Sequence, residues 1–126
     1  MASRVRRPKP RVIVAEENIE IRTAVCTMTI RLNCLAVPAL SASDTLKAIK
    51  RCHVDRGLLD LALTWADGED TLAEVKRVVP MLPVVIMSHL VTPALARRRC
   101  DRGAQSFLVK PVRRDQLAVT LLRHLL

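Results

Sequence analysis

The sequence predicts an α/β domain in which a five-stranded parallel sheet carries helices on both faces. Short apolar or β-branched runs alternate along the 126 residues with segments whose apolar residues recur at helical spacing. The run 83–87, Pro-Val-Val-Ile-Met, is apolar throughout, as buried strands of a parallel sheet tend to be. Parallel strands need crossover connections, and the helical segments supply them.

The first strand is expected at 11–15, Arg-Val-Ile-Val-Ala, and it ends on two acids, Glu16 and Glu17. A helical pattern follows directly, so this part of the chain predicts a strand, an acidic turn and a helix. The apolar positions of that helix are Ile21, Ala24, Val25, Met28 and Leu32.

A weaker strand is expected at 35–40, where Pro38 removes a backbone donor and therefore favours an edge position. Ser43 is expected to cap the next helix, because a serine hydroxyl can accept a hydrogen bond from the first helical turn. That helix carries Leu46 and Ile49 on its apolar face.

The stretch 57–68 is apolar except for Asp60 and a closing Asp-Gly pair, which predicts a buried strand running into a turn. A carboxylate at the end of a buried strand needs a partner, so Asp60 is the first candidate for a functional residue. The spacing then predicts a helix over 69–78.

The last two strands are expected at 83–87, ending on Ser88, and at 106–109, ending on Lys110. Between them, a proline in the first turn indicates a helix over 93–101. The final helix is expected to begin at Asp115 and to bury Leu117, Leu121, Leu122 and Leu125.

Composition excludes several classes of protein. No apolar run is long enough to span a membrane and the N-terminus lacks a signal peptide's apolar segment, so a cytoplasmic protein is expected. The four cysteines lack metal-ligand spacing, which favours free core thiols. Residues 1–10 are expected to form a basic, flexible tail and residues 11–126 the domain. The net charge of +9 leaves nucleic-acid binding as a weaker alternative, because only Trp65 and Phe107 are aromatic.

Polar residues follow the predicted strands at their carboxyl ends. Because ligands of open parallel sheets bind beyond those ends, Glu16, Glu17, Asp60, Ser88 and Lys110 are expected at one site. Carboxylates held together repel one another and need a cation, and oxygen ligands favour Mg²⁺ or a similar ion. With that charge neutralised, one carboxylate can attack a phosphoryl group.

Asp60 is the best candidate for this nucleophile, because its short side chain stands on a rigid central strand. Lys110 would pair with a phosphoryl oxygen, and the Ser88 hydroxyl could donate a hydrogen bond to another. Both contacts exist only while the phosphoryl group is present, which is what a switch requires.

The segments 14–22, 55–60, 81–88 and 103–111 resemble the motifs of the receiver domains of two-component response regulators, the CheY-like superfamily. The resemblance runs from about Val12 to the C-terminus. It implies the flavodoxin-like (βα)5 fold with strand order 2-1-3-4-5. It also implies phosphorylation of Asp60 by a histidine kinase or phosphotransfer protein.

The resemblance further implies a metal site. Glu17 and Asp60 would ligate Mg²⁺, Glu16 would hold a metal-bound water, and the Ala62 carbonyl would supply a further ligand. Two glutamates stand where the family usually has at least one aspartate, and their longer side chains would lower the affinity for the metal.

The resemblance also assigns the parts of a switch. Ser88 would be the switch hydroxyl, Phe107 the aromatic residue whose rotamer follows phosphorylation, and a cis bond before Pro111 would place Lys110 in the site. Phe107 could equally be an ordinary core residue. His89 stands beside the switch hydroxyl, where a small residue is common.

Two functions remain open within this family. The first is a single-domain response regulator that switches partner binding through its last two helices and last strand. The second is a degenerate receiver that acts as an interaction module without phosphorylation. In either case an acidic output protein is expected at an arginine-rich face, whose alternative interpretation is a solvated helix surface. That face includes Arg97, Arg98, Arg99, Arg102 and Arg113.

Overall fold

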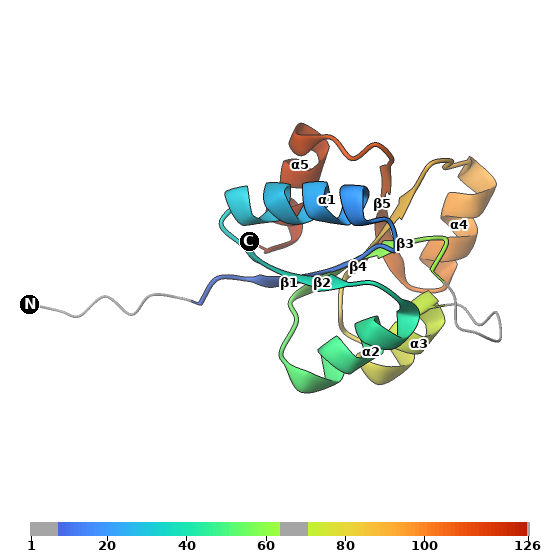
Figure 1. The fold of residues 1–126 in the computed structure, drawn as a ribbon. Helices are drawn as coiled ribbons and strands as arrows, with labels where there is room; N and C mark the ends of the chain where they lie inside the picture. Colours follow the sequence, from blue (N-terminus) through green and yellow to red (C-terminus); the bar gives the residue numbers. More distant parts are fainter. Residues whose placement is uncertain (1–7, 64–70, 126) are drawn as a thin grey trace, which may run out of the picture.

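The computed structural model describes residues 8–63 and 71–125. Five parallel strands form one sheet in the order β2-β1-β3-β4-β5, which confirms the predicted fold class and strand order (Figure 1). The strands are β1 (Arg11–Ala15), β2 (Leu35–Ala39), β3 (Arg56–Asp60), β4 (Val84–Ser88) and β5 (Ala104–Val109). Two of them, β2 and β5, form the edges of the sheet.

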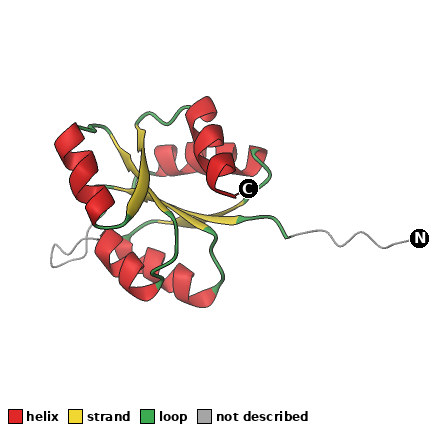
Figure 2. Ribbon diagram, turned by 180° about the vertical axis from the view of Figure 1, so that it is seen from behind, coloured by secondary structure: helices red, strands yellow, loops and turns green. Residues whose placement is uncertain are grey.

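Helices cover both faces of the sheet (Figures 1 and 2). One face carries the first and last helices, the other carries the second and third, and the fourth packs against β5. The helices are α1 (Ile19–Arg31), α2 (Ala42–Arg51), α3 (Thr71–Val78), α4 (Pro93–Asp101) and α5 (Arg114–Leu125). None of the described helices is long and apolar enough to cross a membrane.

The core lies on both sides of the sheet because alternate strand residues point to opposite faces. Ile13, Leu59 and Ile86 pack toward α2 and α3. Leu58, Met87 and their neighbours pack toward α1 and α5, where Leu117 and Leu121 are fully buried. The four cysteines are free, as predicted, although Cys100 is exposed on α4 and is not a core residue.

Three predicted helix features are wrong in detail. Ser41 caps α2, because its hydroxyl accepts a hydrogen bond from the Asp44 amide at 3.0 Å, whereas Ser43 is an exposed residue inside the helix. Ala24 is exposed on α1. Leu122 is also exposed, because it lies about 100° around α5 from the buried Leu121.

Two strand predictions differ in a similar way. β5 begins at Ala104, two residues earlier than expected, because a register irregularity opposite Val84 and Val85 lets the strand continue pairing with β4. β2 lies at an edge as predicted, with Pro38 paired to β1 on one side only. The Asp-Gly turn, the start of the helix predicted at 69 and most of the basic tail lie outside the described residues.

Arg56 is an unexpected core residue. It opens β3, its side chain is fully buried, and it lies on the same face of the sheet as Leu58, beneath α5. Its Nη1 donates to the Thr120 carbonyl at 3.3 Å and to the Gln105 side chain at 3.5 Å. Within the described residues, its Nε and Nη2 atoms have no hydrogen-bond partner. Burial without a carboxylate partner lowers the pKa of the guanidinium.

Candidate functional site

Four of the predicted site residues lie at the carboxyl ends of adjacent strands. Asp60 and Ser88 are the last residues of β3 and β4, and Glu16 and Lys110 follow β1 and β5 directly. Backbone hydrogen bonds fix the two residues that lie beyond the strands. The Glu16 amide donates to the Ala39 carbonyl at 3.0 Å, and the Lys110 amide donates to the Ser88 carbonyl at 2.8 Å.

Lys110 joins the two buried carboxylates. Its Nζ lies 2.8 Å from Glu16 Oε2 and 2.9 Å from Asp60 Oδ1, and all three side chains are buried. Such short contacts between charged groups are the stronger kind of hydrogen bond, and burial weakens their screening by salt. When all three groups are ionised, the cluster carries one net negative charge, so it can still receive a cation.

The electrostatics of this cluster follow from its burial. Burial and the neighbouring Asp60 raise the pKa of the Glu16 carboxyl, and this outweighs the opposing effect of Lys110. For Lys110, burial by itself would lower the pKa of the ammonium group. The hydrogen bonds and charges of Glu16 and Asp60 outweigh burial, so the pKa is raised and Lys110 stays protonated at neutral pH.

Asp60 is also held by the chain that follows it. Its Oδ1 accepts a hydrogen bond from the Ala62 amide at 3.2 Å, and the Leu63 amide donates to the Asp60 carbonyl at 3.1 Å. The Leu61 amide donates to the Met87 carbonyl of β4 at 2.9 Å. The carboxylate therefore sits on a turn that is fastened to the neighbouring strand.

The Ser88 hydroxyl is engaged in a local turn. Its Oγ donates to the Leu90 carbonyl at 2.9 Å and accepts from the Leu90 amide at 3.3 Å. The Lys110–Pro111 peptide bond is cis, as expected. Phe107 is half-buried and packs against the core on the α2 and α3 side of the sheet.

The structure does not bring Glu17 into the group. Its side chain is exposed, whereas Glu16 is buried beside Lys110. Among the described residues, no three histidine, cysteine or acidic side chains are grouped as a metal site. The oxygen donors of Glu16 and Asp60 suit Mg²⁺ chemically. Because both already contact the Lys110 ammonium, Mg²⁺ would have to share them with that group or displace it.

Arg22 is a site residue that the sequence did not single out. It lies on α1, is buried, and its Nη1 donates to the carbonyls of Glu16 and Glu17 at 2.9 and 3.1 Å. It therefore fixes the backbone that presents both acids. Periodicity could not identify it, because a charged residue in a helical pattern is normally placed on the solvent side.

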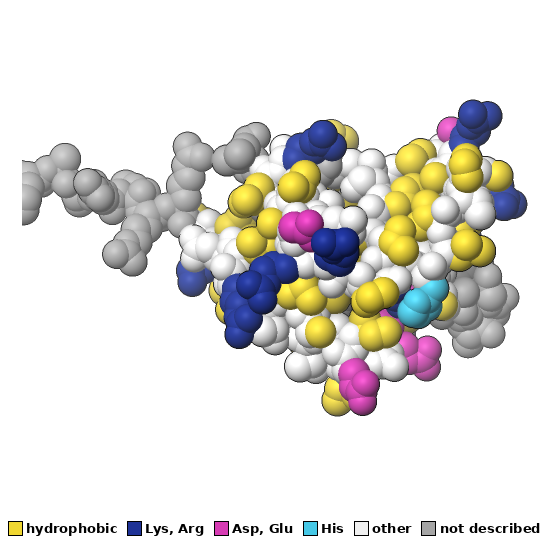
Figure 3. Space-filling model, turned by 90° about the horizontal axis from the view of Figure 1, so that it is seen from above, with side chains coloured by type: hydrophobic (Ala, Val, Ile, Leu, Met, Phe, Trp, Pro, Cys, Tyr) yellow, Lys and Arg dark blue, Asp and Glu magenta, His cyan; other side chains and the backbone are white. Residues whose placement is uncertain are grey.

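The arginine-rich face lies on α4 and at the start of α5. Arg97, Arg98 and Arg113 are exposed, Arg99 is half-buried, and Arg102 follows the last residue of α4. On the face seen from above, the Lys and Arg side chains of the described residues form separate groups between apolar ones (Figure 3).

A doubly wound five-stranded sheet with acids and a lysine at its carboxyl edge defines the receiver class of signalling domains. The response regulator receiver domain model matches residues 12–122, and the chain belongs to this family. The rice two-component response regulator ORR3 is 30% identical over 112 residues, which cover 84% of this chain and 83% of that protein.

Further comparisons agree. Regulatory protein LuxO of Vibrio cholerae is 38% identical over 78 residues, and the match spans 17% of that protein and 62% of this chain. Among solved structures, Vibrio cholerae chemotaxis protein CheY4 has a TM-score of 0.85 at 19% identity, covering 93% of this chain and 99% of that one. NtrX from Brucella abortus also has a TM-score of 0.85, at 28% identity, covering 94% of this chain and 27% of that one.

Proposed function

We propose that the chain is a phospho-accepting receiver whose Asp60 takes a phosphoryl group from a phosphohistidine. The observation that carries this proposal is the position of Asp60, buried at the end of the central strand β3 and bonded to the Lys110 ammonium. An Asp60 oxygen attacks phosphorus, the P–N bond breaks, and its electrons leave with the donor imidazole. The product is an aspartyl phosphate.

The neighbouring residues then have defined roles. Lys110 moves one of its hydrogen bonds from a carboxylate to a phosphoryl oxygen, which requires only a short displacement of Nζ. Ser88 releases the Leu90 carbonyl and donates to another phosphoryl oxygen. The loop after β4 and the half-buried Phe107 adjust to that movement.

Mg²⁺ belongs to the same proposal. Asp60 and Glu17 would ligate it, Glu16 would bind it through water, and the Ala62 carbonyl would complete the protein ligands. When bound, the ion neutralises the carboxylates and the phosphoryl oxygens. Glu17 is exposed on the residue next to Glu16, and Arg22 holds its backbone in place.

The partners follow from the same reasoning. A histidine kinase or phosphotransfer protein supplies the phosphoryl group, and an acidic output protein reads the change at α4, β5 and α5. The exposed Arg97, Arg98 and Arg113 support an acidic partner by charge complementarity. The four free cysteines support action in the reducing cytoplasm.

The experiment is a treatment with acetyl phosphate or phosphoramidate and Mg²⁺, followed by intact mass, on the wild type and on Asp60→Asn. A gain of one phosphoryl group by the wild type alone is expected. No gain, under conditions that label a control receiver, would contradict phosphorylation of Asp60 by small-molecule donors.

A second function is favoured by a specific observation. The side chain of Glu17 is exposed and lies apart from the cluster of Glu16, Asp60 and Lys110, so this acid does not contribute to the site as it stands. A receiver fixed in that state would act as a phosphorylation-independent interaction module. Calorimetric titration with MgCl₂ separates the two functions, because only the first requires saturable binding that Asp60→Asn abolishes.

A further inference from the structure

The outer edge of β5 is unpaired in the described part of the chain. β5 pairs with β4 on one side, and no described strand lies on the other. The Lys110 amide points toward β4, since it donates to the Ser88 carbonyl. Backbone groups alternate in direction along a strand, so Phe107 and Val109 turn their N–H and C=O groups to the free edge.

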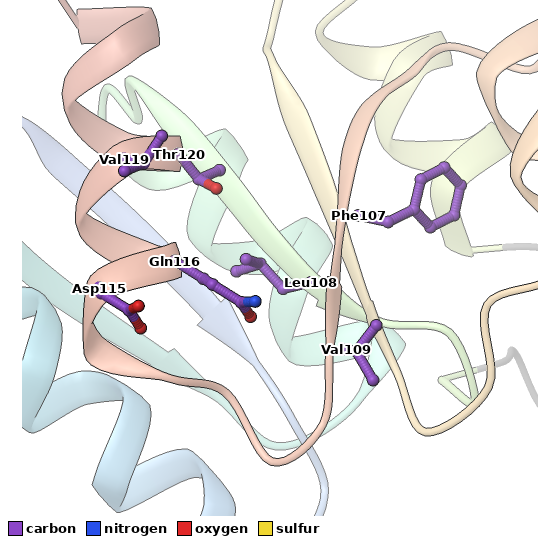
Figure 4. A pocket seen from close by; sticks show the side chains of 7 residues that line it. All are labelled: Phe107, Leu108, Val109, Asp115, Gln116, Val119 and Thr120. Atoms are coloured by element: carbon purple, nitrogen blue, oxygen red, sulfur yellow. The ribbon is translucent and has the colours of Figure 1, made fainter.

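A groove of about 380 Å³ follows this edge beside α5. Figure 4 shows Leu108 pointing toward α5 and Phe107 pointing to the opposite side of the strand. Three consecutive residues of β5 nevertheless line the same groove, so it follows the edge of the strand and not one of its faces. The lining residues are Phe107, Leu108, Val109, Asp115, Gln116, Val119 and Thr120.

The segment 107–109 of this edge lacks the usual protection against strand pairing. Natural edge strands carry charges, prolines or bulges that prevent another strand from adding to them. The opposite edge of the sheet, β2, contains Pro38, whereas β5 contains neither a charged residue nor a proline. Its register irregularity lies opposite Val84 and Val85, before the segment 107–109 that faces the groove. An accessible, regular and apolar edge is suited to pairing.

The surroundings indicate what kind of chain fits. Helices α4 and α5 flank β5 (Figure 1), and the groove between β5 and α5 leaves room for a single extended segment. In a second copy of this chain, β5 would lie equally recessed between its own helices, and two chains of net charge +9 repel each other. Arg113 and Arg114 are exposed at the start of α5, next to the groove residue Asp115, and the Arg113 Nε lies 3.5 Å from Asp115 Oδ1. Two basic side chains therefore stand against one acid at this end of the groove, which favours acidic residues in the partner.

We propose that the free edge of β5 binds an extended segment of a partner protein by strand addition. The segment alternates apolar and polar residues and carries acidic residues at the end that lies near Arg113 and Arg114. Backbone hydrogen bonds to Phe107 and Val109 hold it, and its apolar side chains enter the groove beside Val119. This rests on the proposed function in that β5 belongs to the output surface, but the binding itself requires no phosphoryl group.

The experiment selects displayed random linear peptides on the unphosphorylated chain and, separately, on Asp60→Asn. The selected peptides are synthesised, and their affinities are measured by fluorescence anisotropy. Amide hydrogen exchange is followed by NMR. We expect sequences that alternate apolar and polar residues and have one acidic end, and slowed exchange at the Phe107 and Val109 amides. Methylation of alternate peptide nitrogens should remove binding, because it removes the donors of the ladder.

A matched pair of substitutions tests the position. Val109→Lys places a charge on the edge and should weaken binding at least about tenfold. Leu122→Lys changes an α5 residue of nearly equal exposure, 47% against 48%, that does not line the groove, and it should leave the affinity unchanged.

Three results would overturn the proposal. The first is that no peptide is selected. The second is that the peptides bind without protecting the two amides, which would indicate docking on a helix or in the groove alone. The third is self-association of the chain that Val109→Lys abolishes, which would make a second copy the occupant. None of these experiments requires phosphorylation. If Asp60 fails to accept a phosphoryl group, they still test the binding of an extended segment to β5.

Discussion

Arg56→Met should stabilise the protein. The Arg56 side chain is fully buried beneath α5, and within residues 8–63 and 71–125 no carboxylate pairs with it. Its two hydrogen bonds, to the Thr120 carbonyl and the Gln105 side chain, are long, at 3.3 and 3.5 Å. Methionine is unbranched and flexible, so it can fill the same space without a charge. Replacement of buried charged groups by apolar residues of similar volume is often neutral or stabilising.

The magnitude follows from what is lost and gained. The two weak hydrogen bonds contribute about 1 kcal/mol or less each, and their loss exposes no new charge. Two guanidinium nitrogens without a partner in the described residues each carry a desolvation cost of about 1–3 kcal/mol, and methionine removes both. We expect the free energy of unfolding to rise by about 1–3 kcal/mol, which corresponds to several degrees in Tm for a domain of this size.

Urea denaturation followed by circular dichroism measures this change, and an unchanged m value would show that the two states remain comparable. Arg51→Met is the control, because Arg51 is exposed at the end of α2 and should change stability by no more than about 0.5 kcal/mol. If Arg56→Met destabilised the protein by more than about 1 kcal/mol while Arg51→Met did not, the guanidinium would have a stabilising partner and the reasoning would be refuted.

Three further predictions concern single sites. Burial raises the pKa of the Glu16 carboxyl in the folded state, so folding takes up a proton above pH 4.5 and the free energy of unfolding of the wild type falls as the pH rises there. Glu16→Gln does not titrate at this position, so its free energy of unfolding should rise relative to that of the wild type over the same pH range. Urea titrations in which the variant becomes less stable relative to the wild type would contradict this. Gly103→Ala should lower the free energy of unfolding by about 1–2 kcal/mol, because φ is +106° and Lys76 lies 3.0 Å from the position of the added carbon. Gly57→Ala, whose added carbon has contacts of 3.6 Å or more, should lower it less. Equal melting temperatures of the two variants would refute this. Ser41→Ala should cost about 1 kcal/mol through the lost helix cap and Ser43→Ala almost nothing, and the reverse order in thermal unfolding would contradict the assignment.

The sequence predicted the strands because their residues have few alternatives. A run such as 83–87 can only be buried, and Pro38 in a strand can only lie at an edge without loss of a ladder hydrogen bond. The polar residues at the ends of β1, β3, β4 and β5 then indicated the candidate site, because the topology brings those ends together. Periodicity does not determine where helices begin, since Ser41 and Ser43 are equally good caps in sequence and only the backbone geometry selects Ser41.

The missed residues share a physical cause. Arg22 and Arg56 are both buried arginines, and a sequence pattern places a charged side chain in solvent. Arg22 is buried because two backbone carbonyls at the β1–α1 connection accept its hydrogen bonds. Those acceptors exist only after the chain has turned. Glu17 shows the opposite case. It is adjacent to Glu16 in sequence, but the Glu16 side chain is buried whereas the Glu17 side chain is exposed.

The Glu16, Asp60 and Lys110 cluster also explains how one site could serve either proposed function. A single ammonium now compensates two buried carboxylates. The ionised cluster already carries one net negative charge, and a phosphoryl group on Asp60 would add more, so a second cation would be needed to stabilise the product. If Glu17 turns inward to complete a Mg²⁺ site, the aspartyl phosphate is stabilised and the chain switches. If Glu17 stays at the surface, Lys110 keeps both carboxylates and the resting arrangement is the only stable one. Glu17→Gln therefore tests the switching function directly: it should lower Mg²⁺ affinity and phosphorylation together, and phosphorylation that persists unchanged would show that this side chain is not a ligand.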